Sequence, residues 1–327
     1  MRAGAAGAEG FVRAGGAGAE AGAHSEAGRY GQASEGAKVQ PWARLGDFVA
    51  LTKPRIVELL LVTTVPTMVV AAGGWPSPRA LVATFVGGAL AAGGANAANM
   101  LLERDLDAVM RRTSRRPLVT GAVKPAEAAV FVAGLEVVAF LLLALVVNLL
   151  AALLALSAAA FYVGVYTAVL KRHSPQNIVI GGAAGAMPVL VGWAAVRGSL
   201  SWAPVLLAAL IFLWTPPHFW SLASRYRDDY SRAGVPMMPV VRSLRSTGWQ
   251  VVAYSALTVA ASAGFGVLVG LSWVYWAVSA AAGAMLLWFS VRFLQRPTNK
   301  VAMQLFHWSI TYLSLVFVAM AVDVIAR

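Results

Sequence analysis

Long apolar runs separated by short polar segments fill most of the 327-residue chain. A helix needs about 20 mostly apolar residues to cross a bilayer. Nine runs come close to this length, at residues 54–74, 80–102, 126–147, 149–170, 176–196, 202–223, 248–270, 273–291 and 303–325. Asn148 is the only polar interruption between the third and fourth runs, which predicts a very tight turn there. The pattern predicts an all-α, polytopic membrane protein with nine transmembrane helices.

Positive charges give these helices a direction. If the N-terminus is cytoplasmic, only Arg79, Arg197 and Arg327 of the 26 Lys and Arg residues fall on the opposite side. Lys and Arg gather in the cytoplasmic loops of membrane proteins. We therefore expect the N-terminus inside and the C-terminus outside. This topology explains the formal net charge of +12, so no nucleic-acid partner is expected.

The first 45 residues differ from the rest in composition. They are rich in Ala and Gly, carry scattered charge, and hold few side chains that could be buried. Such a segment cannot offset its ordering entropy. We expect residues 1–45 to be a disordered cytoplasmic tail and residues 46–327 to form the membrane domain. Cysteine is absent, which excludes disulfides and thiolate metal sites.

A first acidic cluster follows the second predicted helix, in NMLLERDLDAVMRRTSRRPLVT (residues 99–120). Asn99, Glu103 and Asp107 are spaced four residues apart and share one face of a helix. Three oxygen ligands on one face suit Mg²⁺, which keeps waters that a phosphate can replace. The arginines that follow can bind phosphate oxygens in a bidentate manner. The segment therefore predicts a metal-bridged diphosphate site; a solvated, salt-bridged loop is the alternative.

A second acidic pair, Asp228 and Asp229, follows the sixth predicted helix on the same side of the membrane and is flanked by arginines. Two facing acidic clusters could hold two metal ions across one diphosphate and stabilise its departure. Polar residues also lie within predicted helices: Glu136, His218 and His307. Each is either a functional group or a side chain that finds a partner inside the bundle.

These segments resemble the UbiA-type intramembrane prenyltransferases, and within them the haem-modifying protohaem IX farnesyltransferase (haem O synthase) branch. The resemblance covers about residues 48 to 325. It rests on LTKPRIV, NMLLERDLDAVMRRTSRRPLVTG, YTAVLKRHSPQNIVIGGAAGAMP, WTPPHFWSLASRYRDDYSRAGVPMMPVV and KVAMQLFHWSITYLSLVF. Glu103 departs from the family pattern, in which Asp is common. Tyr226 and Tyr230 stand where the wider superfamily has the outer acids of its second motif.

The resemblance implies a bundle around an apolar central cavity in which farnesyl diphosphate and protohaem IX meet. The farnesyl group would pass to a vinyl group of haem b, with water addition, to give haem O. Mg²⁺ would be the cofactor, and its ligands, which are also the catalytic residues, would be Asn99, Glu103, Asp107, Asp228 and Asp229. Contacts to the diphosphate would come from Lys53, Arg112, Arg116 and Arg225. His218 would be the candidate for haem binding.

Two other functions stay open at this point. A prenyltransferase of the same architecture could act on another aromatic acceptor, such as 4-hydroxybenzoate. A membrane transporter or lipid carrier could also contain broken helices and buried polar groups, although the acids here gather at one rim rather than at the midplane. The composition favours a bacterial inner (plasma) membrane, with the active-site rim on the cytoplasmic side. An association with a haem A synthase is left open.

Overall fold

The structure, a computed structural model, describes residues 41–327. All the regular elements in this part of the chain are helices, which confirms the predicted all-α class. Residues 1–40 of the predicted tail lie outside the described residues. The first helix, α1 (Pro41–Thr52), begins within the last five residues of that predicted tail. The helical domain therefore begins slightly earlier than the change in composition indicated.

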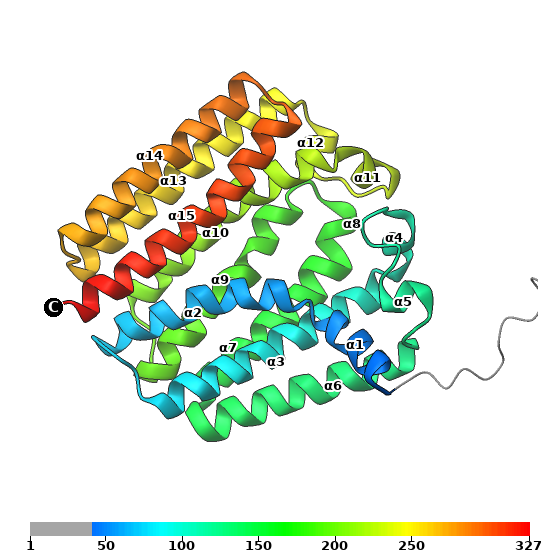
Figure 1. The fold of residues 1–327 in the computed structure, drawn as a ribbon, viewed down its shortest axis with the longest axis horizontal. Helices are drawn as coiled ribbons and strands as arrows, with labels where there is room; N and C mark the ends of the chain where they lie inside the picture. The colour runs from blue at the N-terminus through cyan, green and yellow to red at the C-terminus, as the bar shows by residue number, and fades with distance from the viewer. Residues whose placement is uncertain (1–40) are drawn as a thin grey trace, which may run out of the picture. The chain divides into compact units, whose positions relative to one another are not determined.

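Nine long helical segments coincide with the nine predicted runs (Figure 1). They are α2 (Pro54–Ala72), α3 (Pro78–Leu102), α6 (Pro125–Leu142) with the π-helical η1 (Leu143–Val147), α7 (Leu149–Ala160) with η2 (Phe161–Leu170) and α8 (Lys171–His173), α9 (Asn177–Arg197), α10 (Trp202–Arg225), α13 (Leu244–Val269), α14 (Trp273–Gln295) and α15 (Asn299–Ile325). Eight of them are long and apolar enough to cross a membrane, and α2 contributes a shorter apolar stretch, Val62–Ala72. The chain is a multi-pass membrane protein; the ninth crossing and the N-terminal orientation stay predictions.

Asn148 makes the predicted tight turn between η1 and α7. Its backbone is extended, with φ −165° and ψ 162°, so it interrupts both helices. The side-chain Oδ1 accepts from the Ala151 N–H at 2.9 Å and caps α7. The side-chain amide donates to the Ala194 carbonyl at 2.8 Å and ties the turn to α9. One residue therefore reverses the chain and satisfies backbone groups of two helices.

Small residues allow the helices to approach closely. A Cβ atom on Gly192 of α9 would lie 2.9 Å from the carbonyl oxygen of Thr64 in α2. Close backbone approach through small residues is the usual way in which membrane helices pack. The paired prolines Pro216 and Pro217 are buried inside α10, which continues through them without a break. Proline has no backbone N–H, so α10 lacks the internal hydrogen bonds that these two positions would donate, yet it keeps its helical course.

Short helices gather at one end of the bundle: α4 (Arg104–Val109), α5 (Pro117–Thr120), α11 (Arg227–Arg232) and α12 (Met238–Val241). Figure 1 shows them at the same end as α8, where α3 and α10 finish and α15 begins. We call this end the polar rim. It carries both acidic motifs, as the topology of the chain predicts.

Candidate active site

The first acidic motif forms one buried polar stripe at the end of α3. Although α3 ends at Leu102, the Glu103 N–H donates to the Asn99 carbonyl at 3.0 Å, and the Asp107 N–H donates to the Glu103 carbonyl at 2.8 Å. The helical spacing is therefore kept across the bend into α4. Asn99, Glu103 and Asp107 are only 2%, 1% and 3% exposed. The solvated-loop alternative does not fit this burial.

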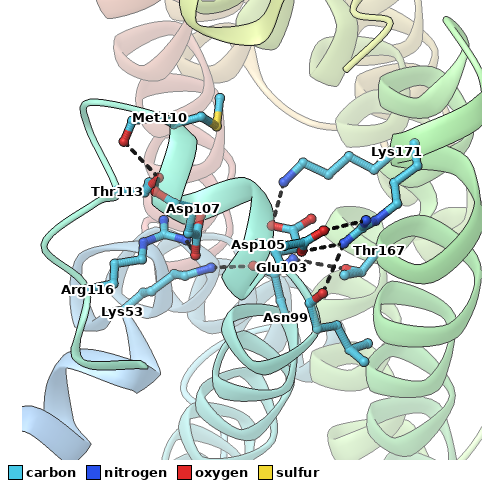
Figure 2. Close-up of polar contacts among 12 residues, drawn as sticks. Lys53, Asn99, Glu103, Asp105, Asp107, Met110, Thr113, Arg116, Thr167 and Lys171 are labelled. Atoms are coloured by element: carbon cyan, nitrogen blue, oxygen red, sulfur yellow. Dashed lines mark hydrogen bonds and ion pairs between the residues drawn. The ribbon is translucent and has the colours of Figure 1, made fainter. Parts of the chain in front are cut away.

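Each residue of the stripe is paired with a cation from another segment (Figure 2). Lys171 Nζ lies 2.6 Å from Glu103 Oε2. The Arg116 guanidinium lies 2.6 Å from Asp107 Oδ2. Lys53 Nζ donates to Asn99 Oδ1 at 2.7 Å. When Lys53 is protonated, three cations surround two carboxylates and leave a net positive charge, which suits an anionic ligand.

Lys53 sits at the centre of this charge arrangement. It is the only described residue other than glycine with a positive φ, at 52°, and it directly precedes the first turn of α2. Burial lowers the pKa of Lys53 to about 7, and the nearby charges of Arg116 and Lys171 act in the same direction. The carboxylates of Glu103 and Asp107 oppose this shift. An added anion would therefore favour the charged form of Lys53.

Two residues of this cluster were not expected from the sequence. Lys171 follows a long apolar run and has the appearance of a residue that only sets topology. Thr167, on the π-helical η2, accepts a hydrogen bond from the Asn99 side-chain amide at 3.0 Å. Both lie 68 residues from their partners, so only the packing of α3 against η2 brings them together. The basic pair Lys171 and Arg172 at the end of the apolar run is the sequence feature that could have indicated Lys171.

Asp105 points away from the stripe. Its carboxylate forms two hydrogen bonds of 2.8 Å with Arg172, and its side chain is 62% exposed. The Arg172 guanidinium lowers the pKa of Asp105. Asp105 is therefore a solvent-facing ion pair at the polar rim and makes no described contact with Asn99, Glu103 or Asp107.

The second acidic motif lies on α11. A contact between Arg112, in the loop after the first motif, and Tyr226, just before α11, brings the two motifs close together. The Arg112 guanidinium carbon lies 5.5 Å above the ring centroid of Tyr226, the residue that joins α10 to α11. Asp228 is exposed, and Asp229 forms an ion pair with Arg232. The two motifs therefore occupy the same end of the bundle, as expected. Arg225 lines a separate cavity with residues of α15.

His218 is enclosed within the bundle. Its ring stacks between Trp214 and Phe306, with ring centroids 4.3 and 4.6 Å away, and its Nδ1 lies 2.9 Å from Ser309 Oγ. Only 7% of the residue is exposed. These contacts match the alternative in which His218 finds a partner within the bundle, so its role in haem binding stays a prediction.

Glu136 lies against Gly94 between α6 and α3. A Cβ atom on Gly94 would approach Glu136 Oε1 to 2.5 Å, so the glycine makes room for this carboxyl group. Oε1 is buried and has no hydrogen-bond partner. Glu136 makes no described contact with either acidic motif, and we assign it no role in the site.

The oxygen donors of the first motif fit a hard divalent cation. Glu103 Oε1 is buried and has no hydrogen-bond partner, although Oε2 is paired. Carboxylate and amide oxygens are the ligands that Mg²⁺ prefers. Among the described residues, no three His, Cys, Asp or Glu side chains are placed to hold one ion by themselves. A metal at this site would therefore need oxygens from its ligand as well, which is the usual arrangement for Mg²⁺ with phosphates.

Comparison with known proteins identifies the family. Residues 60–315 match the UbiA prenyltransferase family. The chain is a member of this family. A protein named protoheme IX farnesyltransferase from Streptomyces coelicolor is 52% identical over 291 residues, which cover 87% of this chain and 92% of that protein. A protein of the same name from Streptomyces avermitilis is also 52% identical, over 87% of this chain and 95% of its own length.

Solved structures with the UbiA fold are similar to this chain. A structure of digeranylgeranylglyceryl phosphate synthase has a TM-score of 0.73 at 18% identity, and the match covers 87% of this chain and all of that chain. A UbiA homolog from Archaeoglobus fulgidus bound to GPP and Mg²⁺ has a TM-score of 0.59 at 18% identity, over 86% of this chain and all of its own. These likenesses confirm the fold of the membrane domain.

Proposed function

We propose that the protein transfers the farnesyl group of farnesyl diphosphate to a vinyl group of protohaem IX. The observation that carries this proposal is the family membership together with relatives of 52% identity that are named protoheme IX farnesyltransferase. The buried, net-positive acidic stripe at the polar rim supports it, because a diphosphate needs both cationic side chains and metal-binding oxygens. The family match favours an enzyme over a transporter.

The residues of the stripe hold the diphosphate in this proposal. Lys53, Arg116 and Lys171 already converge on Asn99, Glu103 and Asp107 at 2.6–2.7 Å. A diphosphate that enters would take over part of their pairing, and a divalent cation bound with it would keep the site close to neutral. Arg112, whose guanidinium group stacks over the ring of Tyr226, also reaches the diphosphate. These cations stabilise the negative charge that grows on the departing oxygen.

A divalent metal, which we propose to be Mg²⁺, would be held by Asn99, Glu103 and Asp107 on one side and by Asp228 and Asp229 on the other. When bound, the metal supplies charge that stabilises the leaving diphosphate. The Archaeoglobus fulgidus homolog binds Mg²⁺ with GPP, a shorter prenyl diphosphate, which supports this choice. The protein residues contribute the oxygen ligands and fix their orientation through pairing with Arg116 and Lys171.

The reaction proceeds at the allylic carbon. Its bond to the diphosphate oxygen breaks, and the electron pair leaves with the diphosphate. The vinyl group of protohaem then forms a new carbon–carbon bond to the allylic carbon. Water adds to the carbocation on the haem side chain and loses a proton, which gives the hydroxyethylfarnesyl group of haem O. The apolar helices below the rim keep bulk water away from the allylic carbon while its bond to the diphosphate breaks.

We place the protein in a bacterial inner membrane with the polar rim on the cytoplasmic side and the N-terminus inside. The distribution of Lys and Arg supports this orientation. Association with a haem A synthase, which would consume the product, is part of the same proposal. This association rests on the chemistry of the product and not on a particular surface of the protein.

The test is product formation by membranes that contain the protein. Farnesyl diphosphate and protohaem should give a more hydrophobic haem on reversed-phase chromatography, and removal of divalent cations by a chelator should abolish it until Mg²⁺ is restored. Product from 4-hydroxybenzoate together with no product from protohaem would show that the acceptor is wrong.

A further inference from the structure

The polar rim contains a second basic site, away from the acidic stripe. A cavity of about 480 Å³ opens between the end of α10 and the first three turns of α15. It is lined by Arg225, Asn299, Lys300, Met303, Gln304 and His307. None of these six residues is acidic. The volume falls within the range of small-molecule sites.

The charges in this cavity are not compensated by the protein. In contrast to Arg116 and Lys171, neither Arg225 nor Lys300 forms an ion pair with any residue that the structure describes. Gln304 Oε1 is buried and has no hydrogen-bond partner. The N-terminus of the 27-residue helix α15 adds positive potential at Lys300. Two free cations beside a helix N-terminus point to an anionic ligand, whereas the Gln304 oxygen is an acceptor and would pair only with a donor group of that ligand.

The cavity also has one aromatic lining residue. His307 lines it and is exposed, and its ring meets Phe306 edge to face with centroids 5.4 Å apart. Phe306 in turn stacks on His218, with ring centroids 4.6 Å apart. A planar ligand in the cavity would therefore meet the His307 ring directly.

We infer that this cavity binds the porphyrin acceptor by its propionate carboxylates, which pair with Arg225 and Lys300. The inference rests on the proposed function. Protohaem carries two propionates on the edge opposite its vinyl groups, so anchoring the propionates at this cavity leaves the vinyl edge free to face the prenyl donor. Arg225, which the sequence assigns to the diphosphate, belongs to the acceptor in this reading.

Protohaem and its dimethyl ester separate the possible outcomes, because the ester keeps the macrocycle and loses both charges. Binding is measured on the purified protein from the shift of the haem absorption band, independently of turnover. Wild-type protein should bind protohaem more tightly than the ester, by about tenfold for each charge-assisted pair. Arg225→Met and Lys300→Met should each weaken protohaem binding by about tenfold, leave ester binding unchanged, and leave the KM for farnesyl diphosphate unchanged.

Arg292→Met is the matched control, because Arg292 lies on α14 and stacks over Trp288 at 5.1 Å outside the cavity. It should bind both haems as the wild type does. If Arg225→Met and Lys300→Met weaken the two haems equally, or raise the KM for farnesyl diphosphate instead, the inference is wrong. Selective binding of protohaem without any prenylated product would leave the inference intact and contradict the proposed function.

Discussion

Replacing Lys171 by Met tests whether the Glu103 carboxylate depends on a single cation. Glu103 Oε2 lies 2.6 Å from Lys171 Nζ, and the side chain of Glu103 is only 2% exposed. Its other oxygen already has no partner. Lys171→Met therefore leaves a buried carboxylate without its ion pair. Removing one partner of a buried pair costs about 3–5 kcal/mol of unfolding free energy.

The companion variants separate charge from packing. Glu103→Gln should lower the free energy of unfolding by only about 1 kcal/mol, because the Lys171 side chain is 16% exposed and can reach water. The double variant, Glu103→Gln with Lys171→Met, should recover most of the stability lost in Lys171→Met, since no unpaired charge stays buried. The double variant should nevertheless form no prenylated haem, because a proposed metal ligand is lost.

Unfolding of the purified protein in mixed micelles with increasing SDS, followed by tryptophan fluorescence, measures these differences. Lys171→Met as stable as Glu103→Gln would refute the reasoning that the buried carboxylate needs this cation. A double variant as unstable as Lys171→Met would attribute the loss to packing instead of charge.

Two further substitutions test the fold. Gly192→Ala should destabilise the protein by about 1–3 kcal/mol, because its Cβ would overlap the Thr64 carbonyl oxygen, whereas Gly185→Ala on the same helix meets open space and should be neutral or slightly stabilising. Equal stability of the two variants in the SDS titration would contradict this packing. Asn148→Ala should lower the free energy of unfolding by about 1–2 kcal/mol, because it removes a helix cap and a hydrogen bond to α9. Its control, Ser157→Ala, loses only a hydrogen bond within its own helix and should change little. Thermal unfolding of the two variants measures the difference.

The sequence predicts the helices well because the bilayer sets a strict length and demands internal backbone pairing. All nine runs coincide with helical segments, and Asn148 forms the tight turn between two of them. The helix α1 was missed because its 12 residues are too few to cross a bilayer, and the predicted tail was extended over the first five of them. The π-helical turns η1 and η2 leave no mark in the hydrophobic pattern.

Residue spacing alone predicts the site only where its residues share one helix, whereas Lys53 and Arg116 came from the family resemblance. The four-residue spacing placed Asn99, Glu103 and Asp107 on one face, and the structure keeps that face through a bend at Glu103. Lys171 and Thr167 could not be found in this way, because a contact across 68 residues depends on how α3 packs against η2. The family resemblance assigns Arg225 to the diphosphate, whereas in the structure Arg225 lines a cavity with residues of α15.

The central claim is that both acidic motifs hold one metal–diphosphate unit. Mn²⁺ can stand in for Mg²⁺, and its electron paramagnetic resonance signal reports binding to the purified protein in the presence of farnesyl diphosphate. We expect tight Mn²⁺ binding by the wild type and by Asp105→Asn, whose carboxylate faces solvent. Asp107→Asn and Asp228→Asn should each lose that binding. Mn²⁺ bound equally well by all four proteins would contradict the account.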